Sequence, residues 1–308
     1  MLKSGLRGVI PVLYAFHGRD GGIDAGAMAK QVEHCIAAGA DGIMVLGLIT
    51  EVSKHSSAER LDIVRITSKA LGRRKPLLVT TGEPTQEGQL AFARESRVAG
   101  ADVIILQPPP ELEGGEAALL RFFGDTADAL DFPCAIQHNP FNLKINLSLE
   151  GLITLCRNHP NISMIKAEGT ALETERLIAA TGGKIAAFTG HGGIEFMTNL
   201  RSGAAGLIPA PDALALQVLI HRLFVEGTPE SLERAERIHR DLLPMIVFRM
   251  RSIDQALCYG KRLVAERIGV DIVHEREPYL RPTAFGLAEM RRHAAYLAAV
   301  EAREGVSR

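Results

Sequence analysis

The chain contains no tryptophan, no excess of either charge and no long apolar run. Lys and Arg total 35 and Asp and Glu 36 among 308 residues, a formal net charge of −1. A balanced charge gives no basis for binding nucleic acid or an anionic membrane surface. No apolar run approaches the roughly 18 residues of a membrane span, and 207–224 is interrupted by Pro209, Pro211 and Asp212. We therefore expect neither nucleic acid nor membrane as a partner.

Cysteine and histidine motifs are also scarce. The four cysteines form no CxxC pair, and the ten histidines form no HxH or HExxH motif. Reduced thiols in a cytoplasmic enzyme explain such cysteines better than disulfides or zinc. The first five residues lack the apolar core of a signal peptide. We expect a cytoplasmic protein with no bound metal and no cofactor.

Eight apolar runs recur along the first three quarters of the chain, with helical patterns between them. Asp24 is placed to cap one such helix, and 57–71, followed by Gly72, forms another. The runs are continuously apolar rather than alternating, as in parallel strands covered on both faces. The predicted strands are 8–13, 42–48, 76–81, 101–107, 132–137, 162–166, 185–189 and 204–209.

This alternation favours an α/β fold, a closed (β/α)8 TIM barrel, over residues 1–225. The alternative is a doubly wound open sheet, but no GxGxxG motif follows the first predicted strand. Residues 226–308 read as a C-terminal helical extension, with helical patterns over 229–251, 253–268 and 283–300.

Lys166 is the lysine that lies within a predicted strand, at the C-terminal end of 162–166. Burial penalises the charged form of a lysine, and a neutral amine is the nucleophile that forms a Schiff base with a keto acid. Barrel active sites lie at the C-terminal ends of the strands. A lysine that merely extends to solvent is the alternative reading. Lys54 and Lys144 are competing nucleophiles on loops at the same end.

Several motifs at the predicted strand ends resemble those of one enzyme family. They are 42–47 with Glu51, Pro140 after the fifth strand, Ile165-Lys166 on the sixth, Thr189-Gly190 on the seventh and 206–208 on the eighth. Together they resemble the dihydrodipicolinate synthase / N-acetylneuraminate lyase family of class I aldolases and dehydratases, over nearly the whole chain.

The resemblance implies a (β/α)8 barrel, usually a homotetramer, whose strand-six lysine forms an imine with pyruvate or with the pyruvyl part of a 2-keto acid. In this sequence that lysine is Lys166. The family's carboxylate-binding amides correspond to Leu48 and Ile49. The substrate-binding residues implied by the resemblance are Gly47, Leu48, Ile49, Gly190 and Ile208.

The chain also departs from the family pattern at the side chains that relay protons. Where the family has Gly-Thr-Thr-Gly-Glu, residues 47–51 of this chain read Gly-Leu-Ile-Thr-Glu. Where the family has Tyr-Asn-x-Pro, residues 137–140 read Gln-His-Asn-Pro. The arginine that grips the aldehyde partner's carboxylate aligns with Asn142, and the tyrosine after strand four has no counterpart in 108–115. The lysine is kept while the relay is replaced.

Two residues are the leading candidates to move protons instead. Glu168 shares a strand face with Lys166, and a partly dry barrel mouth is expected to raise its pKa so that it shuttles protons. The alternative is an ion-pair partner that keeps Lys166 charged and inert. His191 follows the seventh strand among glycines and has a pKa suited to acid–base work, although a substrate contact or a plain loop histidine is equally consistent.

Four further polar residues have weaker claims. Gln137 is expected to position substrate or water, because an amide does not titrate. Alternation turns His138 away from the site if Gln137 faces inward. Tyr14 is read as packing that could supply a phenol, and Glu51 as an ion-pair or loop-anchoring residue.

The sequence thus predicts a Schiff-base lyase, an aldolase or dehydratase for pyruvate or a 2-keto-3-deoxy sugar acid, that is not a true dihydrodipicolinate synthase. A keto-acid-binding protein without turnover is the second hypothesis. An unrelated barrel enzyme with an unused lysine is the third.

Overall fold

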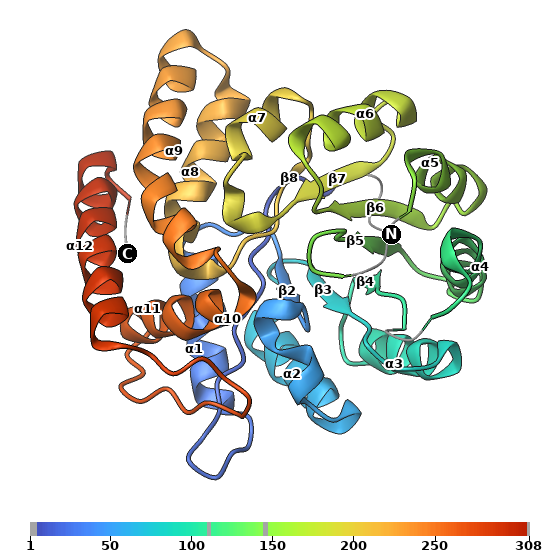
Figure 1. Ribbon diagram of the computed structural model, residues 1–308, viewed down its shortest axis with the longest axis horizontal. Helices are drawn as coiled ribbons and strands as arrows, with labels where there is room; N and C mark the ends of the chain where they lie inside the picture. The colour runs from blue at the N-terminus through green and yellow to red at the C-terminus, as the bar shows by residue number, and fades with distance from the viewer. Residues whose placement is uncertain (1–4, 110–111, 144–146, 307–308) are drawn as a thin grey trace.

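The computed structural model describes residues 5–109, 112–143 and 147–306, and its centre is a sheet of eight parallel strands (Figure 1). The strands are β1 Gly8–Val9, β2 Ile43–Val45, β3 Leu77–Thr80, β4 Val103–Leu106, β5 Cys134–His138, β6 Ile162–Ala167, β7 Ala186–Thr189 and β8 Gly206–Leu207. Each falls within or next to a predicted run, which confirms the strand assignments.

The sheet closes on itself. Its order is β1-β8-β7-β6-β5-β4-β3-β2, which leaves β1 and β2 at the two ends. A parallel bridge joins Val12 to Met44 across that gap, and the Leu13 amide donates to the Met44 carbonyl at 2.9 Å. The predicted (β/α)8 barrel is therefore confirmed, and the open-sheet alternative is wrong.

β1 and β8 are shorter than predicted, although the chain stays extended beyond them. The amides of Ile10 and Val12 donate to the carbonyls of Leu207 and Pro209, at 2.9 and 2.8 Å. Pro11 and Pro209 have no N–H to donate, so regular pairing is interrupted where the prediction carried it on. The inside of the barrel is filled by apolar side chains from the strands, among them Ile10, Met44, Ile105, Met164 and Phe188.

A helix follows every strand, and the barrel helices are α1 Ala25–Ala37, α2 Ser57–Leu71, α3 Gln86–Val98, α4 Gly115–Asp128, α5 Leu149–Asn158, α6 Ala171–Thr181, α7 Phe196–Arg201 and α8 Leu214–Glu226. Asp24 caps α1 by accepting from the Ala27 amide at 2.9 Å, as predicted. Gly72 ends α2 with φ +57°, a conformation that glycine adopts at little cost.

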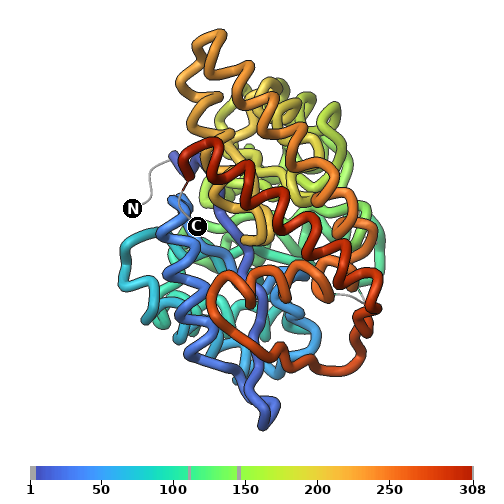
Figure 2. The backbone as a smooth tube through the Cα atoms, turned by 90° about the vertical axis from the view of Figure 1, so that its left-hand side faces the viewer, coloured from blue at the N-terminus to red at the C-terminus, as the bar shows by residue number. Residues whose placement is uncertain are grey.

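The last quarter of the chain is helical, as predicted. Its helices are α9 Pro229–Arg249, α10 Ile253–Gln255, a π-helical turn Ala256–Gly260, α11 Lys261–Arg267 and α12 Ala284–Glu304. Figures 1 and 2 show them on one side of the barrel, with α9 against α8 and α12 lying along α9 and α11. The proposed boundary near residue 225 falls at the end of α8 and stays a prediction.

A buried ion cluster joins this extension to the barrel. The Lys261 ammonium on α11 pairs with the Glu51 carboxylate after β2 and lies 3.0 Å from Glu275. Glu51 also binds Lys54 at 2.7 Å. Burial acts to raise the pKa of Glu51, but the two lysines outweigh it and hold that pKa below its usual value. Glu51 is thus an ion-pair residue, as expected, and its loop is fixed by a helix some 200 residues away.

Replacing Lys261 with Met is expected to lower the free energy of unfolding by about 3 kcal/mol at pH 7. This is the lower end of the range for breaking a buried pair, because Lys54 and Arg262 still pair with the two carboxylates. Since the folded-state pKa of Glu51 is depressed, its stabilisation is present above the unfolded value of about 4.3 and is lost as the pH falls through the folded value.

Urea unfolding at pH 7 and pH 4 checks this prediction, with the exposed Lys69→Met as a matched control. The control should stay within about 0.5 kcal/mol of wild type. An equal loss in the two variants would show that the cluster does not stabilise the protein.

Candidate active site

Lys166 and Glu168 lie at the C-terminal end of β6, on the same side of the strand. β6 pairs in register with β5, so that Lys166 lies beside Gln137, and the Glu168 amide donates to the His138 carbonyl at 2.8 Å. Both side chains are almost fully buried, and the Lys166 Nζ lies 2.9 Å from Glu168 Oε2. The structure thus joins the predicted nucleophile and its predicted acidic neighbour in one ion pair.

Two amide side chains from the end of β5 hold the same carboxylate oxygen. The Gln137 Nε2 donates to Glu168 Oε2 at 2.6 Å, and the Asn139 Nδ2 donates to it at 2.8 Å. Sequence reasoning treated Asn139 only as part of a motif and missed this contact. The signal was available, because residues 137 and 139 share a face of an extended strand. Glu168 Oε1 accepts no hydrogen bond within the described residues.

The expected rise in the pKa of Glu168 is wrong. Burial does act to raise it, but the Lys166 charge, the hydrogen bond from Lys166 and the donor from Gln137 act in the opposite direction, and the pKa ends below its usual value. Reasoning from burial alone omitted the donors that the fold directs at this carboxylate. Glu168 is therefore ionised at neutral pH, so it can accept a proton or balance a positive charge but is not a resting acid.

The pair opens into a cavity in the barrel mouth. Its enclosed volume is about 40 Å³, which is several times the volume that one water molecule needs. With the open space at its mouth the volume is about 450 Å³. Six of the predicted site residues line it, namely Leu48, Ile49, Lys166, Glu168, His191 and Ile208. The other three do not line it: Gln137 acts through Glu168, Gly190 lies against the Glu168 carboxylate, and Gly47 packs near Val12.

Leu48 and Ile49 begin a short helical turn, Leu48–Thr50, on the cavity wall. The Thr50 and Glu51 amides are occupied by the carbonyls of Gly47 and Leu48. Within the described residues the Leu48 and Ile49 amides have no backbone acceptor. The Thr50 hydroxyl, in contrast, is buried and donates to the Leu13 carbonyl at 2.7 Å. Two backbone donors are thus available beside Lys166, while the threonine is structural.

His191 also lines the cavity, on the loop after β7. Its backbone has φ +50°, and Gly192 follows with φ +64°. The imidazole packs edge-on against Phe141, with ring centroids 5.2 Å apart. Its proximity is among the influences that lower the pKa of Glu168.

The other candidates lie away from this cavity. Tyr14 is fully buried and its hydroxyl donates to the Ala256 carbonyl at 3.3 Å. Lys54 is held by Glu51 and by the Arg276 carbonyl at 3.0 Å. Lys144 lies outside the described residues. Lys166 is therefore the one lysine that borders the cavity within the described part of the chain.

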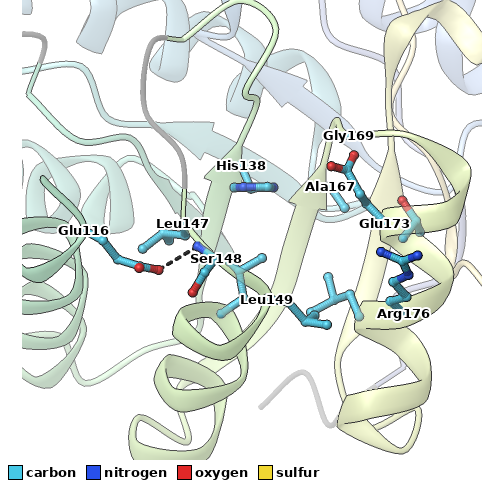
Figure 3. A pocket seen from close by; sticks show the side chains of 12 residues that line it. Glu116, His138, Leu147, Ser148, Leu149, Ala167, Gly169, Glu173 and Arg176 are labelled. Atoms are coloured by element: carbon cyan, nitrogen blue, oxygen red, sulfur yellow. Dashed lines mark hydrogen bonds between the residues drawn. The ribbon is translucent and has the colours of Figure 1, made fainter.

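His138 faces the outside of the barrel wall, as alternation predicts. It lines a separate cavity together with residues of α5 and α6 (Figure 3), and the volume of this cavity is about 490 Å³. Glu116, which also lines this cavity, accepts from the Ser148 amide at 2.6 Å. None of the nine predicted site residues lines this second cavity.

The C-terminal extension supplies a part of the site that sequence reasoning missed. Arg249, Met250 and Ile253, from the end of α9 and the start of α10, line the cavity together with Lys166. Nothing in the local pattern of α9 indicates which of its many arginines faces the barrel. The connection depends on how the helix packs.

Fold and site together define an α/β-barrel enzyme whose candidate nucleophile is a lysine. A model of the Dihydrodipicolinate synthetase family matches residues 5–294. The chain belongs to this family, and it is a lyase. Within the described residues no helix is long and apolar enough to cross a membrane, and no three His, Cys, Asp or Glu side chains there could hold a metal.

Individual relatives agree with this assignment. The chain is 25% identical over 277 residues to 4-hydroxy-tetrahydrodipicolinate synthase of Corynebacterium diphtheriae, covering 89% of this chain and 88% of the relative. It is 28% identical over 239 residues to YagE of Escherichia coli K12, covering 77% and 79%; YagE is named provisionally as a 2-dehydro-3-deoxy-D-gluconate aldolase.

Solved structures show the same fold. The 4-hydroxy-tetrahydrodipicolinate synthase of Methylacidiphilum fumariolicum has a TM-score of 0.88 at 21% identity, covering 96% of this chain and 97% of that one. YagE, solved in complex with pyruvate, has a TM-score of 0.84 at 23% identity, covering 95% and 98%.

Gly190→Ala is expected to displace the Glu168 carboxylate. A Cβ at residue 190 would lie 2.7 Å from Glu168 Cδ and closer still to Oε1, and Gly190 has φ −132°, so backbone strain is not involved. We expect at least a tenfold loss of turnover, about half of the effect of removing an acid–base group on a logarithmic scale. Steady-state kinetics with any substrate of the wild-type enzyme checks this.

Gly26→Ala is the matched control, because its added Cβ would meet nothing nearer than 3.3 Å. Wild-type turnover in both variants would mean that the position of the Glu168 carboxylate is unimportant.

Proposed function

We propose that this chain is a Schiff-base lyase that acts on pyruvate or a 2-keto acid, with Lys166 as the nucleophile. The observation that carries the proposal is the buried pair of Lys166 and Glu168, 2.9 Å apart, in the barrel-mouth cavity. The YagE complex with pyruvate and the aldolase name of that relative support the substrate class. A 2-keto-3-deoxy sugar acid is the substrate type we favour.

The chemistry begins with attack of the Lys166 amine on the C2 carbonyl carbon. The amine must first lose a proton, and Glu168 Oε2 is the acceptor in contact with it. Glu168 then returns the proton to the carbinolamine hydroxyl, which leaves as water, and the resulting protonated imine carries the positive charge that Lys166 carried before. Glu168, ionised again beside it, stabilises that charge.

Bond cleavage next requires a base near C3 or the C4 hydroxyl and an acid for the leaving group. Glu168 Oε1 is the unoccupied oxygen of an ionised carboxylate, which suits the base. His191, which lines the same cavity, is the second proton carrier that we propose. The amides of Leu48 and Ile49 are proposed to hold the keto-acid carboxylate, with Ile208 beside it, while Gly190 leaves space for the Glu168 carboxylate.

A keto-acid-binding protein without turnover is the second candidate. The same ion pair favours it, since Glu168 would then hold Lys166 protonated and unreactive, and no phenol lies in the cavity among the described residues. The two candidates differ in whether Lys166 forms an imine.

We also propose that the protein is a homotetramer in the cytoplasm, as the family resemblance implies. Large exposed apolar side chains such as Leu172, Val225 and Phe285 support association with other copies. The four cysteines are all free, which suits a reducing compartment.

Borohydride reduction with pyruvate tests the proposal directly. We expect the adduct mass on the peptide that carries Lys166 and no adduct in Lys166→Ala. Glu168→Gln and His191→Asn should still form the adduct, while Glu168→Gln loses turnover by about 10² to 10⁴-fold. Labelling at Lys54 or Lys144 would refute the assignment, and keto-acid binding with neither an adduct nor turnover would favour the binding protein.

The chain is not expected to be a competent dihydrodipicolinate synthase. Asn142 lines the cavity where the family arginine would bind the partner's carboxylate, and its amide donates to Asn139 Oδ1 at 3.2 Å. Loss of a charged bidentate contact and of the phenol relay should lower the rate by several powers of ten. Efficient condensation of pyruvate with aspartate semialdehyde in a coupled assay would contradict this.

A further inference from the structure

The proposed mechanism leaves one cavity-lining charge without a role. Arg249, at the end of α9, is 2% exposed and borders the same cavity as Lys166. A guanidinium stays protonated even when buried, so its five N–H donors require acceptors. The acceptors around this side chain therefore show whether its role is structural or whether it has donors available for a ligand.

The protein satisfies only part of the guanidinium. Its Nε lies 2.6 Å from Asp212 Oδ2, an ion pair that fastens α9 to the turn after β8. The Nη1 atom contacts only the Met250 Sδ, at 3.3 Å, and a thioether is a weak acceptor. The Nη2 atom is buried and has no hydrogen-bond partner within the described residues. By hydrogen-bond geometry Nε and both Asp212 carboxylate oxygens also lack a partner within the described residues, so the contact with Asp212 is a charge contact, and neither terminal nitrogen of Arg249 has a strong acceptor.

The loop after β7 leaves room for this end of the side chain. Gly192 lines the cavity, and a Cβ there would lie 2.9 Å from Arg249 Nη2. Its φ of +64° is also one that favours glycine. The backbone thus leaves space for Nη2, one of the two nitrogens that lack a strong acceptor.

We infer that Arg249 forms a binding subsite for a second carboxylate of the substrate, at the end away from the imine carbon. Two terminal N–H groups side by side match the two oxygens of a carboxylate. The first carboxylate already has donors in the proposed site, the amides of Leu48 and Ile49. The inference rests on the proposed function and narrows it to 2-keto acids that bear a further carboxylate.

The experiment compares two 2-keto acids of equal chain length, 2-oxoglutarate and 2-oxopentanoate, in borohydride trapping at Lys166. In the wild-type protein, the concentration of 2-oxoglutarate that gives half-maximal trapping should be at least tenfold lower than that of 2-oxopentanoate. Arg249→Met should raise the half-saturating concentration of 2-oxoglutarate by about ten- to a hundredfold, which corresponds to the loss of a hydrogen bond to a charged group. The half-saturating concentration of 2-oxopentanoate should change by less than about threefold.

Two further variants keep the test decisive. Arg249→Lys retains the positive charge but lacks the two parallel N–H donors of a guanidinium, so it should weaken 2-oxoglutarate binding by about tenfold. This variant tests the inference even if Arg249→Met fails to fold. The exposed Arg251→Met, two residues along, is the control and should match wild type.

The outcomes separate the two claims. If the Arg249 variants weaken the binding of both keto acids equally, or if wild type does not distinguish the two, Arg249 is only the partner of Asp212. The inference is then wrong, while the assignment of Lys166 as the nucleophile is unaffected. If wild type traps no keto acid at all, the proposed function fails, and the inference fails with it.

Discussion

The site depends on one buried carboxylate. Glu168 would be unstable as an anion in the barrel mouth without the three donors that converge on its Oε2, from Lys166, Gln137 and Asn139. These donors keep it ionised, hold Lys166 in the cavity and leave Oε1 free. Gly190 completes the arrangement by having no side chain where Oε1 lies. In the proposed mechanism, a carboxylate held in this way takes the place of a phenol relay as base and counter-ion, with no resting acid of its own.

The helices beyond the barrel complete the site rather than merely covering it. Lys261 fixes the loop that carries Leu48 and Ile49 through Glu51, and Arg249 reaches the cavity through its pair with Asp212. Both connections place a charged side chain of the extension, itself almost fully buried, against a barrel loop. Changes in α9 or α11 should therefore affect substrate binding as well as stability.

Sequence patterns sufficed for the barrel because its signals are local. Apolar runs, a capping Asp24 and a terminating Gly72 each act within a few residues, and alternation alone turned His138 outward. Lys166 stood out for the same reason, as a lysine within an apolar strand. The contacts of Asn139 and Arg249, and the direction of the pKa shift of Glu168, could not be derived so simply. Each depends on which donors the closed barrel brings together from distant segments.

The most direct test of the account is a crystal structure of the protein reduced with borohydride in the presence of pyruvate. We expect continuous electron density from the Lys166 Nζ to C2 of the pyruvyl group, the carboxylate on the Leu48 and Ile49 amides, and Glu168 still beside the nitrogen. Pyruvate bound without a covalent bond, or joined to a lysine outside this cavity, would contradict the account.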